Sequence, residues 1–132
     1  MSLTQDRPVY LNLLRIRQPV TAVVSILHRI SGILMVLALP GLIYLLQLSL
    51  SSPAGFSQAA AMLDGPIARI FGVLMIWALA HHLFAGIRFL ILDFDVGVSR
   101  SVSRKTAWLV HLSAAVVALL SVGLLFLPGA LL

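Results

Sequence analysis

The sequence has no cysteine and very few charged residues. Without cysteine the chain forms no disulfide, ligates no iron–sulfur cluster through its own thiolates and attaches no c-type haem covalently. Only 10% of the 132 residues are charged, and the four acids are Asp6, Asp64, Asp93 and Asp95. The sequence contains no Gly-rich phosphate loop, catalytic triad or paired carboxylates, and it has no flavin-binding motif. These absences exclude most classes of enzyme.

The residues that are present are mostly apolar. Hydrophobic residues make up 61% of the chain, and the mean hydropathy is +1.09. Such a composition is typical of an integral membrane protein with little mass outside the bilayer. The net charge is +5, but the nine basic residues stand beside the apolar segments and do not form one patch. We therefore expect a membrane lipid environment and no binding of nucleic acid.

Three long apolar segments predict an all-α membrane protein with three transmembrane helices. The predicted spans cover residues 19–49, 67–94 and 106–127. The first helix is expected to start just after Pro19, and its charge-free part of about 21 residues is long enough to cross a bilayer. Pro40 is expected to kink this helix.

The remaining segments are short, so the chain is predicted to be a single membrane-anchor domain. Residues 1–18 lack the long apolar core of a signal peptide and are expected to form an arm on the water side. Residues 58–63 in the first loop are expected to form a short interfacial helix. The segment after the second span, DVGVSRSVSRK, is predicted to be a polar, basic connection.

The basic residues predict the orientation of the chain. Those that precede the first span or flank the second loop are Arg7, Arg15, Arg17, Arg88, Arg100, Arg104 and Lys105. The first loop contains only Arg69, and no basic residue follows the third span. The positive-inside rule then places the N-terminus and the second loop in the cytoplasm, and the C-terminus outside.

Two adjacent histidines interrupt the second apolar span. An imidazole inside a membrane usually faces a partner or a cofactor. His82 and Gly86 are four residues apart and share a helix face, where the glycine leaves a notch that a planar macrocycle can fill. His82 is therefore a candidate axial ligand of a non-covalent b haem. The alternative is a histidine bonded to a neighbouring helix.

A second polar cluster lies at the start of the first span. Ser25, His28 and Arg29 have the spacing of one helix face, and the predicted topology brings them to the same membrane depth as His82. A guanidinium at this depth requires an anion, a carbonyl dipole or water. Haem propionates or a quinone carbonyl satisfy that requirement. The alternatives are an arginine that extends to the lipid headgroups and a serine that bonds its own helix.

Two motifs carry a resemblance to a known family. They are S-x-x-H-R-x-S-G at residues 25–32 and H-x-x-x-G-x-R-x-x-x-x-D at residues 82–93. With the three spans, they resemble the cytochrome b-type membrane anchor of bacterial succinate dehydrogenase, respiratory complex II. The resemblance covers nearly the whole chain. It implies a non-catalytic electron-transfer subunit of a succinate:ubiquinone oxidoreductase in the bacterial inner (cytoplasmic) membrane.

The resemblance also implies partners, cofactors and site residues. The partners are a second small membrane anchor, which completes the helical bundle, an iron–sulfur subunit and a flavoprotein subunit. The two anchors share one haem b, and ubiquinone is reduced where the subunits meet. By resemblance, His82 ligates the haem iron, His28 and Arg29 lie near the haem propionates, and Ser25 and Arg29 lie at the quinone site.

Several points depart from the family pattern or remain open. Phe89 stands where many relatives have a histidine. His81 projects about 100° from His82 on a helix, so only one of the two can face a given haem; Gly86 and the motif spacing favour His82. His111 is expected to be an interfacial or packing residue, with an intrachain second haem ligand as the alternative. There are two alternative functions. The chain could be the anchor of a related fumarate reductase, or it could be a haem-free scaffold or small transporter subunit.

Overall fold

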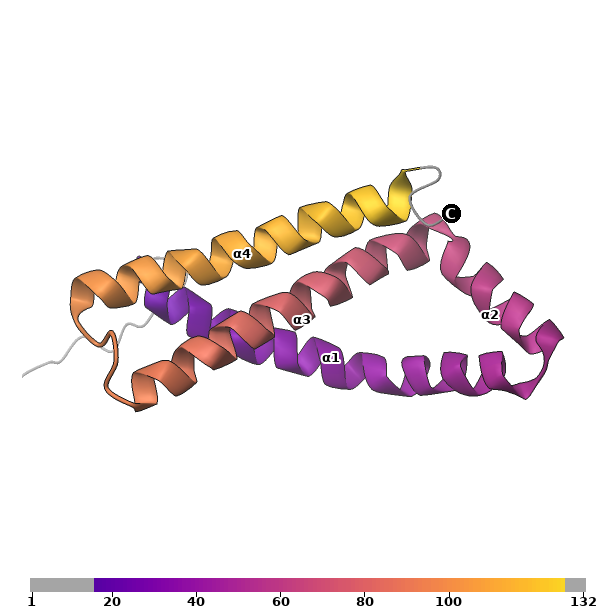
Figure 1. Cartoon of the computed structure of the whole chain (residues 1–132), viewed down its shortest axis with the longest axis horizontal. Helices are drawn as coiled ribbons and strands as arrows, with labels where there is room; N and C mark the ends of the chain where they lie inside the picture. The colour runs from indigo at the N-terminus through magenta and orange to yellow at the C-terminus, as the bar shows by residue number, and fades with distance from the viewer. Residues whose placement is uncertain (1–15, 128–132) are drawn as a thin grey trace, which may run out of the picture.

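The structure is a computed structural model, and it describes residues 16–127. These residues form four helices and no strand: α1 (Val20–Ser51), α2 (Pro53–Asp64), α3 (Pro66–Asp93) and α4 (Arg100–Phe126) (Figure 1). Helices α1, α3 and α4 are each long and apolar enough to cross a membrane. The predicted all-α fold with three spans is confirmed. Most of the predicted arm, residues 1–15, lies outside the described residues.

Helix α1 begins directly after a proline, as the sequence predicts. Pro19 has extended backbone angles, with φ at −65° and ψ at 149°, and stands at the N-cap of the helix. Thr21 therefore lies in the first turn. The helix continues through Pro40 to Ser51. A proline inside a transmembrane helix is tolerated where neighbouring groups satisfy the freed carbonyl.

Helix α2 lies between the far ends of α1 and α3 (Figure 1). It includes the short helix predicted at residues 58–63 but begins earlier, at Pro53. The Ser52 hydroxyl caps it by accepting from the backbone N–H of Gly55 at 3.0 Å, and a proline at the first position favours helix initiation. A Cβ on Gly55 would overlap the carbonyl oxygen of Leu48. This corner therefore requires glycine.

The connection between α3 and α4 is shorter than the sequence predicts. Helix α4 starts at Arg100, whereas the polar, basic connection was expected to reach Lys105. Asp95 and Gly97 adopt positive φ angles of 59° and 77° in the remaining turn, which aspartate tolerates and glycine allows freely. The basic residues therefore form the first turns of α4.

Helix α3 packs along α4 and against the first half of α1. Small residues allow the close approach of α3 and α4: Ala78 and Ala85 on α3 and Ala107 and Ala114 on α4 are fully buried. Small side chains at such interfaces are typical of membrane helices. Only Val24 and Ser31 are buried on α1, and both lie in its first half. The core therefore sits where α1 begins, α3 ends and α4 begins.

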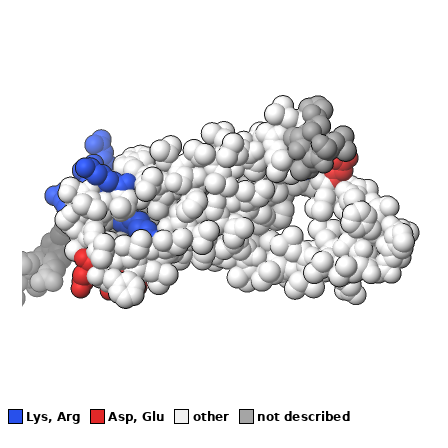
Figure 2. Space-filling view, viewed as in Figure 1, with Lys and Arg blue, Asp and Glu red and all other residues white. Residues whose placement is uncertain are grey.

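Most of the surface is apolar, and the described basic residues other than Arg69 gather at one end. In Figure 2 the blue side chains lie at the left, where α1 and α4 begin. The centre of the molecule in that view is uncharged. This distribution is typical of a protein whose middle lies in hydrocarbon and whose basic end lies at a membrane surface.

Candidate functional site

The orientation of the His82 ring is fixed by hydrogen bonds from α1. Its Nδ1 lies 3.1 Å from the carbonyl oxygen of His28 and 3.3 Å from the hydroxyl oxygen of Ser31. A carbonyl only accepts, so Nδ1 carries the proton and donates it. In the neutral imidazole Nε2 then carries the lone pair, which is the arrangement of a histidine that ligates a metal. His82 is only partly buried, so a group outside the chain can approach it.

The two clusters predicted from the sequence meet at His28 and His82. Their imidazole rings stack with centroids 4.0 Å apart and planes 14° apart. The edge of Phe89 contacts the His28 ring, with centroids 5.3 Å apart and planes at 78°. Helices α1 and α3 thus bring a histidine of the first motif directly onto a histidine of the second.

Gly32 makes this close approach possible. A Cβ on Gly32 would lie 3.1 Å from Cε1 of His82, which is tighter than normal contact. A Cβ on Gly86 would lie 3.6 Å from Nε2 of His28, which is an ordinary contact, so the His28 ring lies beside the notch that Gly86 was expected to leave for a macrocycle. Sequence reasoning singled out Gly86 but missed Ser31 and Gly32. The signal was present, because these two residues end the first motif and lie three and four positions after His28.

The neighbouring His81 points to a different helix. Its side chain is fully buried, and neither ring nitrogen has a hydrogen-bond partner in the part of the chain that the structure describes. Its ring centroid lies 5.4 Å from that of His111 on α4 and 5.5 Å from that of Trp77. His81 is thus enclosed by this chain, while His82 reaches its surface. His111 packs against His81, in agreement with its predicted packing role.

Ser25 and Arg29 lie one turn apart on α1, on either side of His28 along the chain. Ser25 is partly buried, and Arg29 is exposed at the surface of the chain. The structure therefore brings the first motif to His82 through His28 and directs Arg29 outward. An exposed guanidinium beside a partly buried hydroxyl can donate to a carbonyl or anionic group on a molecule bound outside this chain.

The sequence did not indicate the environment of Arg88. It was counted as a charge flanking the second loop, yet it is buried between α3 and α4 and bonded to Ser103 and Thr106 on α4. A hydropathy pattern records that a residue is charged but not whether a neighbouring helix covers it.

Comparisons with known proteins agree with this architecture. A succinate dehydrogenase cytochrome b556 subunit from Coxiella burnetii is 37% identical over 106 residues, which are 79% of this chain and 84% of that protein. The protein of the same name from Paracoccus denitrificans is 28% identical over 121 residues, which are 92% of this chain and 93% of that protein. Residues 4–122 match the family described as "Succinate dehydrogenase/Fumarate reductase transmembrane subunit". The chain belongs to this family of membrane subunits, as its two motifs predicted.

Proposed function

We propose that the chain is the haem b-binding membrane anchor of a succinate:ubiquinone oxidoreductase and supplies part of its quinone site. The names of both relatives contain succinate dehydrogenase and cytochrome b556, which favours this function over the reverse flux of a fumarate reductase. The chain has no cysteine and no flavin-binding motif, so we assign the iron–sulfur and flavin cofactors of such a complex to other subunits. We place its N-terminus in the cytoplasm of a bacterial cell, because the basic residues flank the same side of the membrane.

The observation that supports haem binding most strongly is the state of His82. Its Nδ1–H donates to the carbonyl of His28, which fixes the ring and leaves Nε2 free to bind iron, and the residue is only partly buried. A carbonyl that accepts from a ligating imidazole also raises the basicity of the ligand. His81 does not have this arrangement, since it is fully buried. When bound, a b haem accepts and donates single electrons.

The rest of the site favours a shared haem. His82 is partly buried and would supply one ligand to the haem iron, and we assign the other ligand to the second membrane anchor. His28 stacks on His82, and Arg29 follows it on the exposed side of α1. We assign both to the haem propionates, because a guanidinium pairs with a carboxylate through two parallel hydrogen bonds.

Ser25 and Arg29 are assigned to the quinone. A hydroxyl and a cation near a quinone carbonyl stabilise the negative charge that develops on its oxygen during reduction. Arg29 lies at the surface of the chain, which is where the docked iron–sulfur subunit and the second anchor would complete a quinone pocket. The guanidinium of Arg29 would then donate hydrogen bonds both to the haem propionates and to the quinone.

The test of haem binding is the absorption spectrum of the assembled complex. We expect His82→Leu to remove the sharp reduced bands of a low-spin haem. The matched control is His81→Leu, the same change at the adjacent position, which replaces a buried imidazole by an apolar side chain and should retain the bands. If His81→Leu removes the bands and His82→Leu keeps them, the assignment of the ligand is wrong.

A further inference from the structure

A buried cation without a counter-ion lies on another face of α3. Arg88 is six residues after His82, which places it about 120° around the helix, and it is only 6% exposed. Its Nε donates to the hydroxyl of Thr106 at 3.1 Å. Its Nη2 donates to the hydroxyl and the carbonyl of Ser103 at 2.9 and 3.2 Å. All of these acceptors are neutral.

The charge of Arg88 is therefore hydrogen-bonded but not neutralised by the described residues. The one ion pair among residues 16–127 joins Arg69 to Asp64, at the opposite end of α3. No described group accepts from Nη1 of Arg88, although a guanidinium has five N–H donors. An unpaired charge is expensive in a membrane interior, and such residues usually face an anion, water or a ligand pathway.

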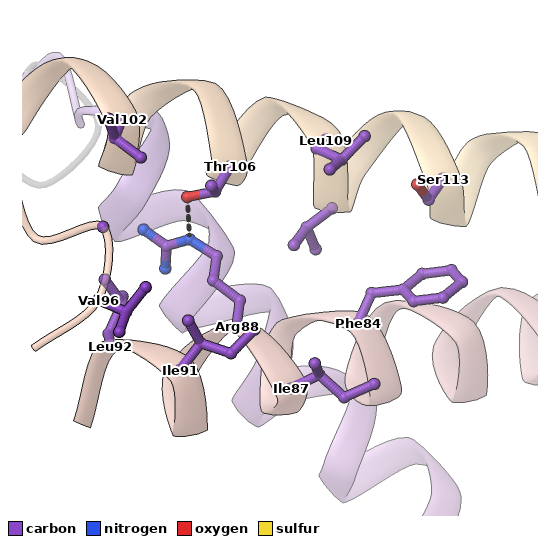
Figure 3. Close-up of a pocket in the computed structure, with 12 residues that line it drawn as sticks. Phe84, Ile87, Arg88, Ile91, Leu92, Val96, Val102, Thr106, Leu109 and Ser113 are labelled. Carbon is purple, nitrogen blue, oxygen red and sulfur yellow. Dashed lines mark hydrogen bonds between the residues drawn. The ribbon is translucent and has the colours of Figure 1, made fainter. Parts of the chain in front are cut away.

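A cavity of about 300 Å³ lies directly beside Arg88, between α3 and α4. Apart from Arg88, Thr106 and Ser113, its walls are formed by apolar side chains and Gly97. Figure 3 shows the guanidinium near Val102 and Val96 at one end and Phe84 at the other. Ile87, Ile91 and Leu109 line the cavity and are also exposed, so the cavity opens on the outer surface of the chain. It is thus a slot with a charged end at Arg88 and a mostly apolar body, in which Ser113 is the one polar residue.

The polar end of the cavity lies near the basic end of the molecule. Arg88 precedes the end of α3 by five residues, which corresponds to about 7.5 Å along the helix. Arg100, Arg104 and Lys105 stand at the same end of the molecule, in the first turns of α4. This end carries the basic residues visible in Figure 2, and its charge attracts anionic lipids in general. Among these basic residues only Arg88 lines the cavity.

We propose that the cavity binds one anionic phospholipid, with its phosphate on Arg88 and an acyl chain along Ile87, Leu109 and Phe84. A phosphate supplies the negative charge that the neutral partners of Arg88 lack, and arginine binds phosphate through paired donors. A quinone fits less well, because it is neutral and would leave the cation uncompensated. The site is separate from the face that carries His82 and does not depend on the haem or quinone assignments.

The experiment measures lipid retained by the assembled complex. Complexes with wild-type chain, Arg88→Gln and Arg104→Gln are delipidated with detergent in parallel, and the bound phospholipids are extracted and quantified. We expect Arg88→Gln to lose one anionic phospholipid per copy of the chain. Arg104→Gln removes an exposed arginine at the same end of the molecule and should retain the wild-type number. In addition, phosphatidylglycerol nanodiscs should raise the melting temperature of the wild-type complex by a few degrees over phosphatidylcholine nanodiscs.

A second variant keeps the test decisive if Arg88→Gln fails to assemble. Leu109→Trp narrows the apolar body of the cavity and leaves Arg88 and its hydrogen bonds intact. It should lose the same lipid and the same thermal response to phosphatidylglycerol. Equal anionic lipid in the wild type and Leu109→Trp would overturn the proposal. Loss of the partner subunits from Arg88→Gln with unchanged lipid would also overturn it, because the counter-ion would then be a carboxylate of another protein.

Discussion

The rings of His28 and His82 stack 4.0 Å apart, although the residues are separated by 54 positions in the sequence. Because the His28 carbonyl also accepts the His82 Nδ1–H, α1 determines both the tautomer and the direction of the His82 ring. The proposed ligand therefore depends on packing between two helices and not only on its own helix. Variants on α1 should affect it without changing α3.

Gly32 is the α1 residue that tests this dependence most directly. A methyl group at this position would lie 3.1 Å from Cε1 of His82 and would push the ring. We expect Gly32→Ala to lower the haem content of the complex and shift its reduced bands, with a cost of about 1–3 kcal/mol for overpacking. Gly41→Ala is the control on the same helix, because a methyl there meets nothing within 4 Å. Identical spectra for the two variants would contradict the role of α1.

Substitution of Arg29 by lysine distinguishes a specific binding site from a contact with lipid headgroups. If Arg29 only extends to the lipid headgroups, Arg29→Lys should be nearly silent, because lysine does the same. If it donates to a quinone carbonyl, the planar guanidinium matters. Losing one charge-assisted hydrogen bond of about 1.5–3 kcal/mol should then reduce quinone reductase activity on the order of ten- to a hundredfold.

Ser25→Ala should produce a smaller loss of the same kind. The control for both variants is reductase activity with an artificial dye, which reports only on the soluble subunits and should not change. A parallel fall in both activities would indicate failed assembly and remove the support for a quinone site at Ser25 and Arg29.

Gly55 at the corner between α1 and α2 should tolerate no side chain. A Cβ there would overlap the backbone carbonyl of Leu48, which cannot move like the end of a flexible side chain. We expect Gly55→Ala to destabilise the complex by about 1–3 kcal/mol, measured as a lower melting temperature. Gly65→Ala, at the other end of α2, is the control because nothing lies within 4 Å of its Cβ. A wild-type melting temperature for Gly55→Ala would show that the corner rearranges freely.

The predicted orientation can be checked with reporters fused to the C-terminus. A reporter that is active only outside the cytoplasm should be active there, and one inserted between Gly97 and Arg100 should be inactive. The reason is that four basic residues flank the second loop and none follows the third span. Activity in the reverse pattern would overturn the assigned topology.

The number and placement of the spans could be predicted from the sequence because hydropathy and length decide them. The start of α4 could not, because the basic residues from Arg100 to Lys105 are compatible with both a loop and an exposed helix. The convergence of His28 and His82 followed from the topology. Their stacking did not follow, because it depends on Gly32 and on how closely two helices approach.

The burial of His81 and the partial exposure of His82 could not be predicted from the sequence either. The sequence indicates that His81 and His82 face different directions, because neighbours on a helix diverge by about 100°. Which of them α4 covers depends on the rotation of α3 within the bundle, and only the structure gives that rotation. The burial of Arg88 follows from the same rotation, since His81, Ala85 and Arg88 form one buried stripe.

The second half of α1 contributes no buried residue to this chain. In water, so long an apolar surface would cause aggregation, but lipid tails solvate it as well as another helix does. This half of α1 can therefore be covered by the bilayer alone. Its later pairing must be selected by the fit of side chains and by polar contacts, because no water is released from this surface. Insertion of this helix into the membrane and its packing against a partner are thus driven by different forces.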